Sequence, residues 1–334
     1  MKKWILIIIF FLSIPATSNA KTPTIGFMTG LVRGSTINDP YNSITSSGLF
    51  KIQREYKFNV LTQRPDNNDI KSIEKAFQNL IDQNADLIVC SGYQFSEPGK
   101  KIAKRYPQTL FIMNDAGLVN NLPNVSAPNF AQHEGSFLVG ALAGKITKTG
   151  KVGFIGGVDV PPLRAFLIGY QEGVHYSNAN VEVTHVFITN APDYSGFTSP
   201  EKGRSMAKKM YGQDVDIIYN AASLSGNGVI QEAKNQKKFV IGVDYNQDAM
   251  AKGYVLTSML KRLDISTYKE VKDYLDGNFQ SGSKVYGLKD GGISLTEMIF
   301  TRHIIPVTVR EYLKDIESKI ISGEIKITDY LMNH

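Results

Sequence analysis

The chain has 334 residues, 37 of them Lys or Arg and 31 Asp or Glu, for a formal net charge of +6 with a single cysteine. Two of the basic residues lie within residues 1–20, which contain no acid, so the remainder carries 35 basic and 31 acidic residues, about +4. This excess is too small and too dispersed to indicate a nucleic-acid partner. The length suits two lobes of ordinary domain size better than one core.

Residues 1–20 have the pattern of a cleaved secretory signal. Lysines at 2 and 3 precede an unbroken apolar run at 4–12, and Ser18-Asn19-Ala20 offers small residues for cleavage. The alternative, a transmembrane helix, is disfavoured because the run is shorter than the roughly 20 residues that span a bilayer. We therefore expect a chain that begins near Lys21, is exported to a periplasm and does not span the membrane.

The only cysteine, Cys90, is far from the expected cleavage point, so we expect no lipid anchor. It lies in the apolar run 86–92 and has no second cysteine with which to form an intramolecular disulfide. A lone cysteine in such a run is usually a small core residue. An oxidising compartment also disfavours a persistent reactive thiol.

Short apolar runs alternate with segments of helical spacing, which is the pattern of parallel strands joined by crossover helices. The expected strands are 24–31, 58–62, 86–92, 109–115, 151–157, 181–188, 215–221 and 238–244. The expected helices are 42–56, 68–83, 97–105, 132–147, 161–177, 200–211, 227–236, 264–277 and 308–322. Helix 132–147 is rich in Gly and Ala and is expected to be tightly buried.

The first four strands resemble the second four in order and spacing, which predicts an α/β protein of two doubly wound, Rossmann-like lobes joined by a hinge. We expect 21–129 plus about 250–284 in lobe 1, and 130–249 plus about 285–334 in lobe 2. Ligands of such sheets bind beyond the carboxyl ends of the strands. The segments to watch are 29–42, 91–95, 114–118, 190–197, 221–228, 244–247 and 257–261.

Several residues in these segments are candidates for ligand contact. Asp39 suits a helix cap and a ligand contact equally well, and Tyr41 and Asn42 are better contact candidates. The turn at Gly226 would bring backbone N–H groups to a helix start, where a hydroxyl or anion can bind, although an ordinary turn is as plausible.

Aromatic residues also lie near the predicted strand ends, at Tyr41, Tyr93, Tyr194 and Phe197. Such rings suit a flat heterocycle, although scattered aromatics are more often core residues. The five histidines show no metal-ligand spacing, and we find no catalytic constellation and no cofactor motif.

The chain resembles the basic membrane protein family, the nucleoside-binding receptors of ABC importers. The resemblance begins at Asp39, Tyr41, Asn42 and Gly48 and runs in order through nearly all of the chain after residue 20. It continues at 125–130, 140–144, 147–157, 169–173, 216–219, 226–228, 241–244, 255–261 and 287–292. The sequence departs from the family pattern at Asn38, Pro40 and Ser199, which puts the base preference in doubt and leaves the fold unaffected.

The resemblance implies a type I periplasmic binding protein fold that seals a nucleoside between its lobes by hinge closure and delivers it to an inner-membrane ABC permease. It implies a monomer without enzymatic activity. The alternatives are a receptor for riboflavin or another flat polyol, a receptor that feeds a signalling partner, and, from a different class, a nucleoside-processing enzyme.

By this resemblance Tyr41 and Phe197 sandwich the base, with Tyr93 as a further contact. Asp244 and Lys261 hold the sugar hydroxyls, with Asp115 and the Gly226 backbone nearby. The competing interpretation is that Asp244 and Lys261 form a salt bridge across the hinge. Both interpretations can hold, because a paired carboxylate and ammonium still offer an acceptor and donors.

Overall fold

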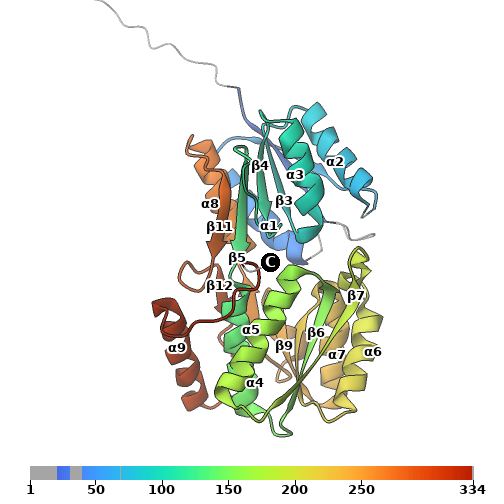
Figure 1. The fold of residues 1–334 in the computed structure, drawn as a ribbon, viewed down its shortest axis with the longest axis vertical. Helices are drawn as coiled ribbons and strands as arrows, with labels where there is room; N and C mark the ends of the chain where they lie inside the picture. Colours follow the sequence, from blue (N-terminus) through green and yellow to red (C-terminus); the bar gives the residue numbers. More distant parts are fainter. Residues whose placement is uncertain (1–20, 31–39, 68, 333–334) are drawn as a thin grey trace, which may run out of the picture.

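The computed structural model describes residues 21–30, 40–67 and 69–332, in which two six-stranded sheets form the centres of two lobes (Figure 1). The expected signal peptide, 1–20, lies outside the described residues. The predicted α/β fold with two doubly wound lobes is confirmed. Each expected helix and strand is present, with ends that differ from the expected ones by at most three residues.

The first sheet is entirely parallel, in the order β11-β5-β4-β3-β1-β2. Its strands are β1 (Thr24–Met28), β2 (Asn59–Gln63), β3 (Leu87–Ser91), β4 (Leu110–Asn114), β5 (Val125–Phe130) and β11 (Gly282–Tyr286). The helices of this lobe are α1 (Pro40–Gln53), α2 (Ile70–Asp82), α3 (Ser96–Arg105) and α8 (Leu263–Leu275).

The second sheet has the order β12-β10-β9-β8-β6-β7 and is parallel except for β12. Its strands are β6 (Lys151–Asp159), β7 (Glu182–Asn190), β8 (Ile217–Ala221), β9 (Phe239–Asp244), β10 (Val255–Lys261) and β12 (Ile293–Leu295). The helices are α4 (Gln132–Ile146), α5 (Pro161–Ser177), α6 (Pro200–Tyr211), α7 (Gly226–Gln236) and α9 (Val307–Ser322).

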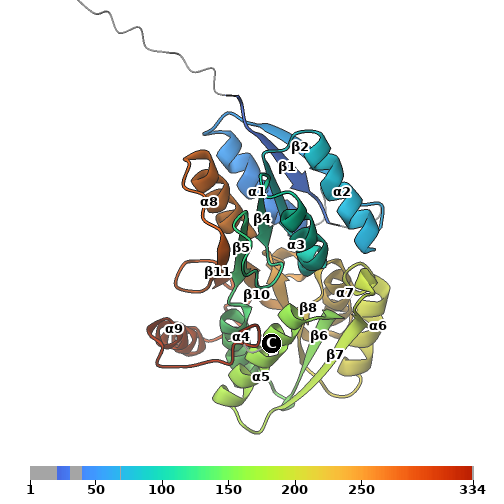
Figure 2. The same cartoon turned by 45° about the horizontal axis from the view of Figure 1, so that its top comes forward.

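Each sheet is covered by helices on both faces. In the first lobe α1 and α8 pack on one face and α2 and α3 on the other, as Figure 2 shows from a second side. Cys90 is a core residue on the second of these faces, as expected, and burial raises the pKa of its thiol. In the second lobe α4, α5 and α9 cover one face, and α6 and α7 the other.

The small residues of α4 let it pack closely against α5. A Cβ on Gly140 would lie 2.2 Å from the carbonyl oxygen of Tyr170, and one on Gly173 would lie 2.0 Å from that of Phe137. Both distances are shorter than any tolerable contact, so the two helices can approach this closely only with glycine at these positions. The sequence expectation of a tightly buried helix is confirmed.

Strands β5, β10, β11 and β12 were not among the expected strands, and β10 changes the division into lobes. We expected residues from about 250 to 284 in lobe 1, but β10 pairs with β9 and β12 in the second sheet. The return to the first lobe therefore comes after β10, with α8 and β11. The expectation fails there because hydrogen bonding to β9, and not position along the chain, decides which sheet takes the strand.

Three segments connect the lobes, at Ala131, at Arg262 and at 287–292. They are joined by hydrogen bonds from the Ala131 N–H to the Tyr286 carbonyl, 2.9 Å, and from the Arg262 N–H to the Gly292 carbonyl, 2.8 Å. A hinge made of three short, mutually bonded segments can absorb a rotation of one lobe against the other.

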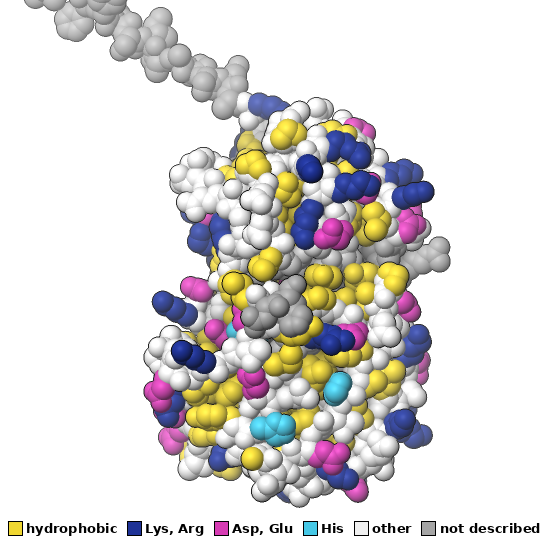
Figure 3. Space-filling view, viewed as in Figure 1, with side chains coloured by type: hydrophobic (Ala, Val, Ile, Leu, Met, Phe, Trp, Pro, Cys, Tyr) yellow, Lys and Arg dark blue, Asp and Glu magenta, His cyan; other side chains and the backbone are white. Residues whose placement is uncertain are grey.

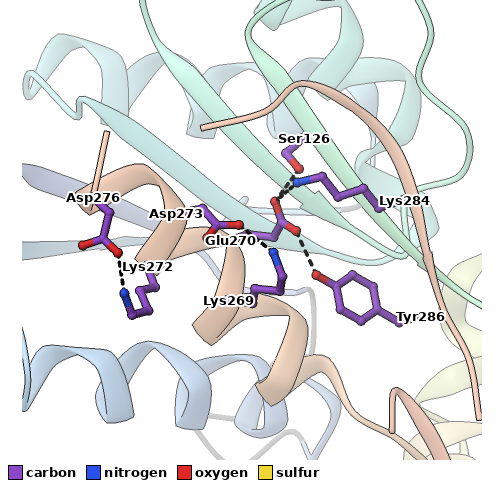
Figure 4. Close-up of polar contacts among 8 residues, drawn as sticks. All are labelled: Ser126, Lys269, Glu270, Lys272, Asp273, Asp276, Lys284 and Tyr286. Atoms are coloured by element: carbon purple, nitrogen blue, oxygen red, sulfur yellow. Dashed lines mark hydrogen bonds and ion pairs between the residues drawn. The ribbon is translucent and has the colours of Figure 1, made fainter. Parts of the chain in front are cut away.

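Glu270 on α8 fastens the elements of lobe 1 that lead into all three connections (Figure 4). Its side chain is 1% exposed, and it accepts hydrogen bonds from Ser126 on β5, 2.7 Å, and from Tyr286 on β11, 2.9 Å. Lys284 on β11 forms an ion pair with it at 2.5 Å. One buried carboxylate therefore links α8, β5 and β11 on the lobe 1 side of the hinge.

Candidate ligand-binding site

A cavity with about 870 Å³ of empty space, partly open to solvent, lies between the two lobes. Its walls come from the segments that follow the carboxyl ends of strands in both sheets, where doubly wound folds bind ligands. In the view of Figure 3, hydrophobic side chains gather at the waist between the lobes. The lining residues are Gly30, Tyr41, Asn42, Gly92, Tyr93, Gln94, Asp115, Val160, Pro162, Leu163, Phe166, Tyr194, Phe197, Thr198, Ala221, Ser223, Val243, Asp244 and Lys261.

The cavity brings together most of the residues that the sequence singled out. They come from both lobes and are Tyr41, Asn42, Tyr93, Asp115, Phe197, Asp244 and Lys261. Asp39 lies outside the described residues, and Gly226 is not part of the cavity wall. Side chains more than 200 positions apart in the sequence, such as Tyr41 and Lys261, thus line the same cavity.

Gly226 is buried at the start of α7, and its N–H turns back toward the carbonyl groups of Ser223 and Leu224. A Cβ there would lie 1.9 Å from the side-chain oxygen of Asn220, so glycine is required by packing. Ser223 and Ala221, a few residues earlier, form the wall instead. The structure therefore favours the ordinary turn for Gly226 over the predicted ligand contact.

Lys261 is the most deeply buried charged group of the cavity, at 1% exposed. Its Nζ lies 2.6 Å from Oδ2 of Asp115 and about equally far from the ring centres of Phe130 and Phe166, at 5.3 and 5.2 Å. The Tyr41 hydroxyl donates to the same Asp115 oxygen, also at 2.6 Å. An ammonium between two aromatic faces and a carboxylate is favourably placed out of water.

The ion-pair partner of Lys261 in this cluster is Asp115, which the sequence analysis expected only in the vicinity of Lys261 and Asp244. Asp115 follows β4 in the first lobe and Lys261 ends β10 in the second, so their ion pair joins the lobes. Both described bonds to the carboxylate use Oδ2. Asp115 lines the cavity, so its carboxylate is in a position to accept a hydrogen bond from a ligand hydroxyl.

Asp115 and Asp244 both have backbones in the left-handed region, with φ of 54° and 67°. Aspartate tolerates this region better than most residues, but it remains sparsely populated. Each residue directly follows or ends a strand at the cavity edge, and the bend turns the chain there. Residues with such sparsely populated backbone conformations are often found at ligand sites.

Asn42 on α1 fixes the end of the first strand segment. Its side-chain oxygen accepts the Gly30 N–H at 2.9 Å, and its side chain is 7% exposed. A Cβ on Gly30 would meet the Asn42 amide nitrogen at 2.6 Å, so glycine makes room for this amide. Asn42 therefore has a structural role as well as a place in the cavity wall.

Phe197 is held by the strand beneath it. It ends the short helix Tyr194–Phe197 after β7, and a Cβ on Gly157 of β6 would lie 2.3 Å from its ring carbon Cδ1. The Phe197 ring thus packs directly against the backbone of Gly157, which has no side chain. Tyr41 belongs to the first lobe and Phe197 to the second, so each lobe contributes one of these rings to the cavity wall.

Two tyrosines also face the cavity from opposite lobes. Burial and the neighbouring Glu97 raise the pKa of Tyr93, and burial and Tyr93 itself raise the pKa of Tyr194. Both hydroxyl groups are therefore protonated at neutral pH and can donate hydrogen bonds.

One side of the cavity lies outside all of the expected segments and is formed by Val160, Pro162, Leu163 and Phe166. These residues follow β6 and open α5. The rule that pointed to the other segments, the carboxyl end of a parallel strand, applies here too and was not used for this strand. Gln94 lies within the expected segment 91–95 but was not singled out as a contact.

The arrangement suits binding and supplies few reactive groups. No cluster of three or more His, Cys, Asp or Glu side chains that could hold a metal ion occurs within residues 21–30, 40–67 and 69–332. None of the helices in the same part of the chain is long and apolar enough to cross a membrane. Among the described residues, the cavity wall offers aromatic faces, the buried ammonium of Lys261 and the carboxylates of Asp115 and Asp244.

Comparison with known proteins agrees with this architecture. The family model described as "ABC transporter substrate-binding protein PnrA-like" matches residues 28–330. Basic membrane protein A2 of Borrelia garinii subsp. bavariensis is 31% identical over 97% of this chain and 96% of its own length. The CD4+ T-cell-stimulating antigen of Listeria monocytogenes is 33% identical over 73% and 70%.

A solved structure extends the agreement to three dimensions. An ABC transporter system solute-binding protein from Aeropyrum pernix superposes with a TM-score of 0.80 at 27% identity, over 92% of this chain and 93% of that one. The expected periplasmic binding protein fold is thereby confirmed. The chain belongs to the Bmp family of ABC transporter substrate-binding proteins.

Proposed function

We propose that this protein binds a nucleoside between its two lobes and presents it, unchanged, to an ABC permease. The observation that carries the proposal is the buried cluster of Lys261, Asp115 and Tyr41 in a cavity with aromatic rings from both lobes.

Each part of a nucleoside has suitable partners in this cavity. Tyr41 and Phe197 provide aromatic faces for the base, and stacking is favourable for any heterocycle. We assign the sugar hydroxyls to Asp115, Asp244 and Lys261, because a carboxylate accepts from one hydroxyl while an ammonium donates to its neighbour. A deep, buried charged cluster favours a ligand with several hydroxyls over an apolar one.

Riboflavin remains the second candidate, because its flat ring system and polyol chain would use the same rings and charged groups. A nucleoside-processing enzyme is the candidate from another class. Incubating the purified protein with nucleosides and measuring turnover separates an enzyme from a receptor.

The test of the proposal is a thermal-shift panel of nucleosides and riboflavin. A nucleoside at a hundred times its dissociation constant should stabilise the fold by about 2.7 kcal/mol. Mass spectrometry of ligand released from the denatured, freshly purified protein shows whether the site is already occupied. An unmoved melting temperature with no co-purified ligand would contradict the proposal, and a shift with riboflavin alone would favour the second candidate.

The aromatic clamp is tested separately. Tyr41→Ala and Phe197→Ala should each weaken nucleoside binding by about 0.5–1.5 kcal/mol through lost stacking, and more through lost burial. Tyr41→Phe is the matched control, because it keeps the ring and removes only the hydroxyl that bonds Asp115. Unchanged affinity in both alanine variants would remove the clamp from the proposal.

We also propose that residues 1–20 are removed on export, that the protein acts as a monomer in the periplasm without a lipid anchor, and that closure turns about the connections at Ala131, Arg262 and 287–292. In this division lobe 1 keeps 21–130 and 263–286. Intact mass and N-terminal sequencing of the secreted protein test the cleavage. Light scattering tests the monomer.

A further inference from the structure

Asp244 occupies the cavity wall with a backbone φ of 67°. A non-glycine residue keeps such a conformation only where its surroundings hold it. The Tyr245 N–H donates to the Val243 carbonyl at 2.8 Å, which closes a tight turn around Asp244. The backbone position from which the Asp244 side chain leaves therefore depends in part on what holds Val243.

Val243 is fixed by the side chain of Gln247. This glutamine is fully buried, and its Oε1 accepts the Val243 N–H at 2.9 Å. The Asn220 amide of β8 donates to the same oxygen at 3.5 Å. The Gln247 side chain thus accepts the hydrogen bond from the Val243 N–H, a role that a backbone carbonyl of a neighbouring strand would otherwise have.

The backbone of Gln247 is in turn attached to β10. Its N–H donates to Oγ of Ser258 at 3.0 Å, and that hydroxyl donates to Asp248 at 2.7 Å. Ser258 lies three residues before Lys261 on the same strand. The turn that carries Asp244 is therefore fastened to the strand that carries Lys261.

Gly242 leaves the space for this fastening. In the register of β9 and β10 it lies opposite Ser258, and a Cβ there would be 2.6 Å from the Ser258 hydroxyl and 2.8 Å from Oε1 of Gln247. A side chain at this position would displace both groups.

We propose that Gln247 is a positioning residue for ligand binding, which sets the Asp244 carboxylate relative to the Lys261 ammonium so that both meet neighbouring hydroxyls of one ligand. Gln247 is not part of the cavity wall, so it acts through Asp244. The proposal deepens the nucleoside function proposed above and rests on it.

The variant Gln247→Met keeps the length and burial of the side chain and removes the acceptor. Its ribonucleoside affinity should fall about tenfold, or about 1.4 kcal/mol. Affinity for the 2′,3′-dideoxy counterpart should fall much less, because that ligand lacks the hydroxyls that Asp244 and Lys261 meet. In an Asp244→Asn background the same change should cost less than about twofold, since coupled residues do not add.

Asn124→Leu is the control for a buried amide with a purely structural role. Asn124 is 3% exposed and donates to the carbonyl groups of Ala103, Tyr106 and Thr109, at the amino edge of the first sheet, opposite the cavity. This variant should lose stability and keep the ratio of ribonucleoside to dideoxynucleoside affinity.

Hydrogen exchange of the ligand-free protein gives a readout that needs no ligand. Exchange of the Val243 and Tyr245 amides should speed up in Gln247→Met and stay unchanged in Asn124→Leu. Unchanged exchange in Gln247→Met would overturn the proposal, as would faster exchange with an unchanged affinity ratio. If the wild type binds no nucleoside, the proposed function is wrong and the ligand part of this inference with it. If the wild type binds and Gln247→Met keeps the ratio, only this inference is wrong.

Discussion

Lys261→Met removes the buried ammonium and keeps most of the side-chain volume. The Asp115 carboxylate, 7% exposed, would lose its ion pair at 2.6 Å and retain the hydrogen bond from Tyr41. Removing one partner of a buried pair typically costs about 3–5 kcal/mol, because the other charge stays buried without compensation. The retained tyrosine bond puts the expected loss near the lower end, about 3 kcal/mol of the free energy of unfolding.

The assay is urea denaturation of the ligand-free protein, with unfolding monitored by fluorescence. The control is the double variant Asp115→Asn with Lys261→Met, which removes both charges and should be more stable than Lys261→Met alone. A single variant as stable as the wild type, or a double variant no more stable than the single one, would refute the view that the pair is a coupled, buried unit.

The same variant tests the role in binding. Lys261→Met should fold at low denaturant yet bind ribonucleosides much more weakly. The wild type should bind deoxyribose forms more weakly than ribose forms, because a missing hydroxyl leaves a buried charged group unpaired at a cost of roughly 1–3 kcal/mol. Equal affinity for both sugars together with normal binding by the variant would remove Lys261 from the site.

Two further predictions concern packing and pH. Gly157→Ala should displace the Phe197 ring, whose Cδ1 would lie 2.3 Å from the new methyl carbon, and should therefore weaken ligand binding measured by calorimetry. The control, Gly212→Ala, has its nearest contact at 3.3 Å and should bind the ligand normally. Normal binding by both variants would contradict the proposed packing of the Phe197 ring on Gly157. Burial raises the pKa of Glu232, but hydrogen bonds from neighbours including Arg204 outweigh it and leave the pKa below its ordinary value of 4.5. A depressed carboxylate pKa adds stability above the unfolded value, and that stability is lost as the pH falls through the folded one. The melting temperature of Glu232→Gln should therefore fall less than that of the wild type on acidification below about pH 4.5, and parallel curves would show that Glu232 contributes nothing there.

The sequence by itself determined the local elements and located part of the cavity wall. Helices and strands follow from the spacing of apolar residues, which is a local property and reads correctly to within a few positions. The carboxyl ends of those strands also located the segments that hold Tyr41, Asp115 and Phe197, because parallel strands bring their carboxyl ends to one edge of a sheet. Lys261 lies in the expected segment 257–261 but ends β10, which was not among the expected strands.

Only the tertiary structure decided how distant segments pair. Nothing in residues 255–261 alone says that β10 joins the second sheet, since the hydrogen bonds that decide it come from β9 and β12. Likewise the partner of Lys261 is 146 positions away, and the choice of Asp115 depends on how the two lobes meet. Periodicity records which side of an element is buried, whereas the neighbour it is buried against is settled by packing of the whole chain.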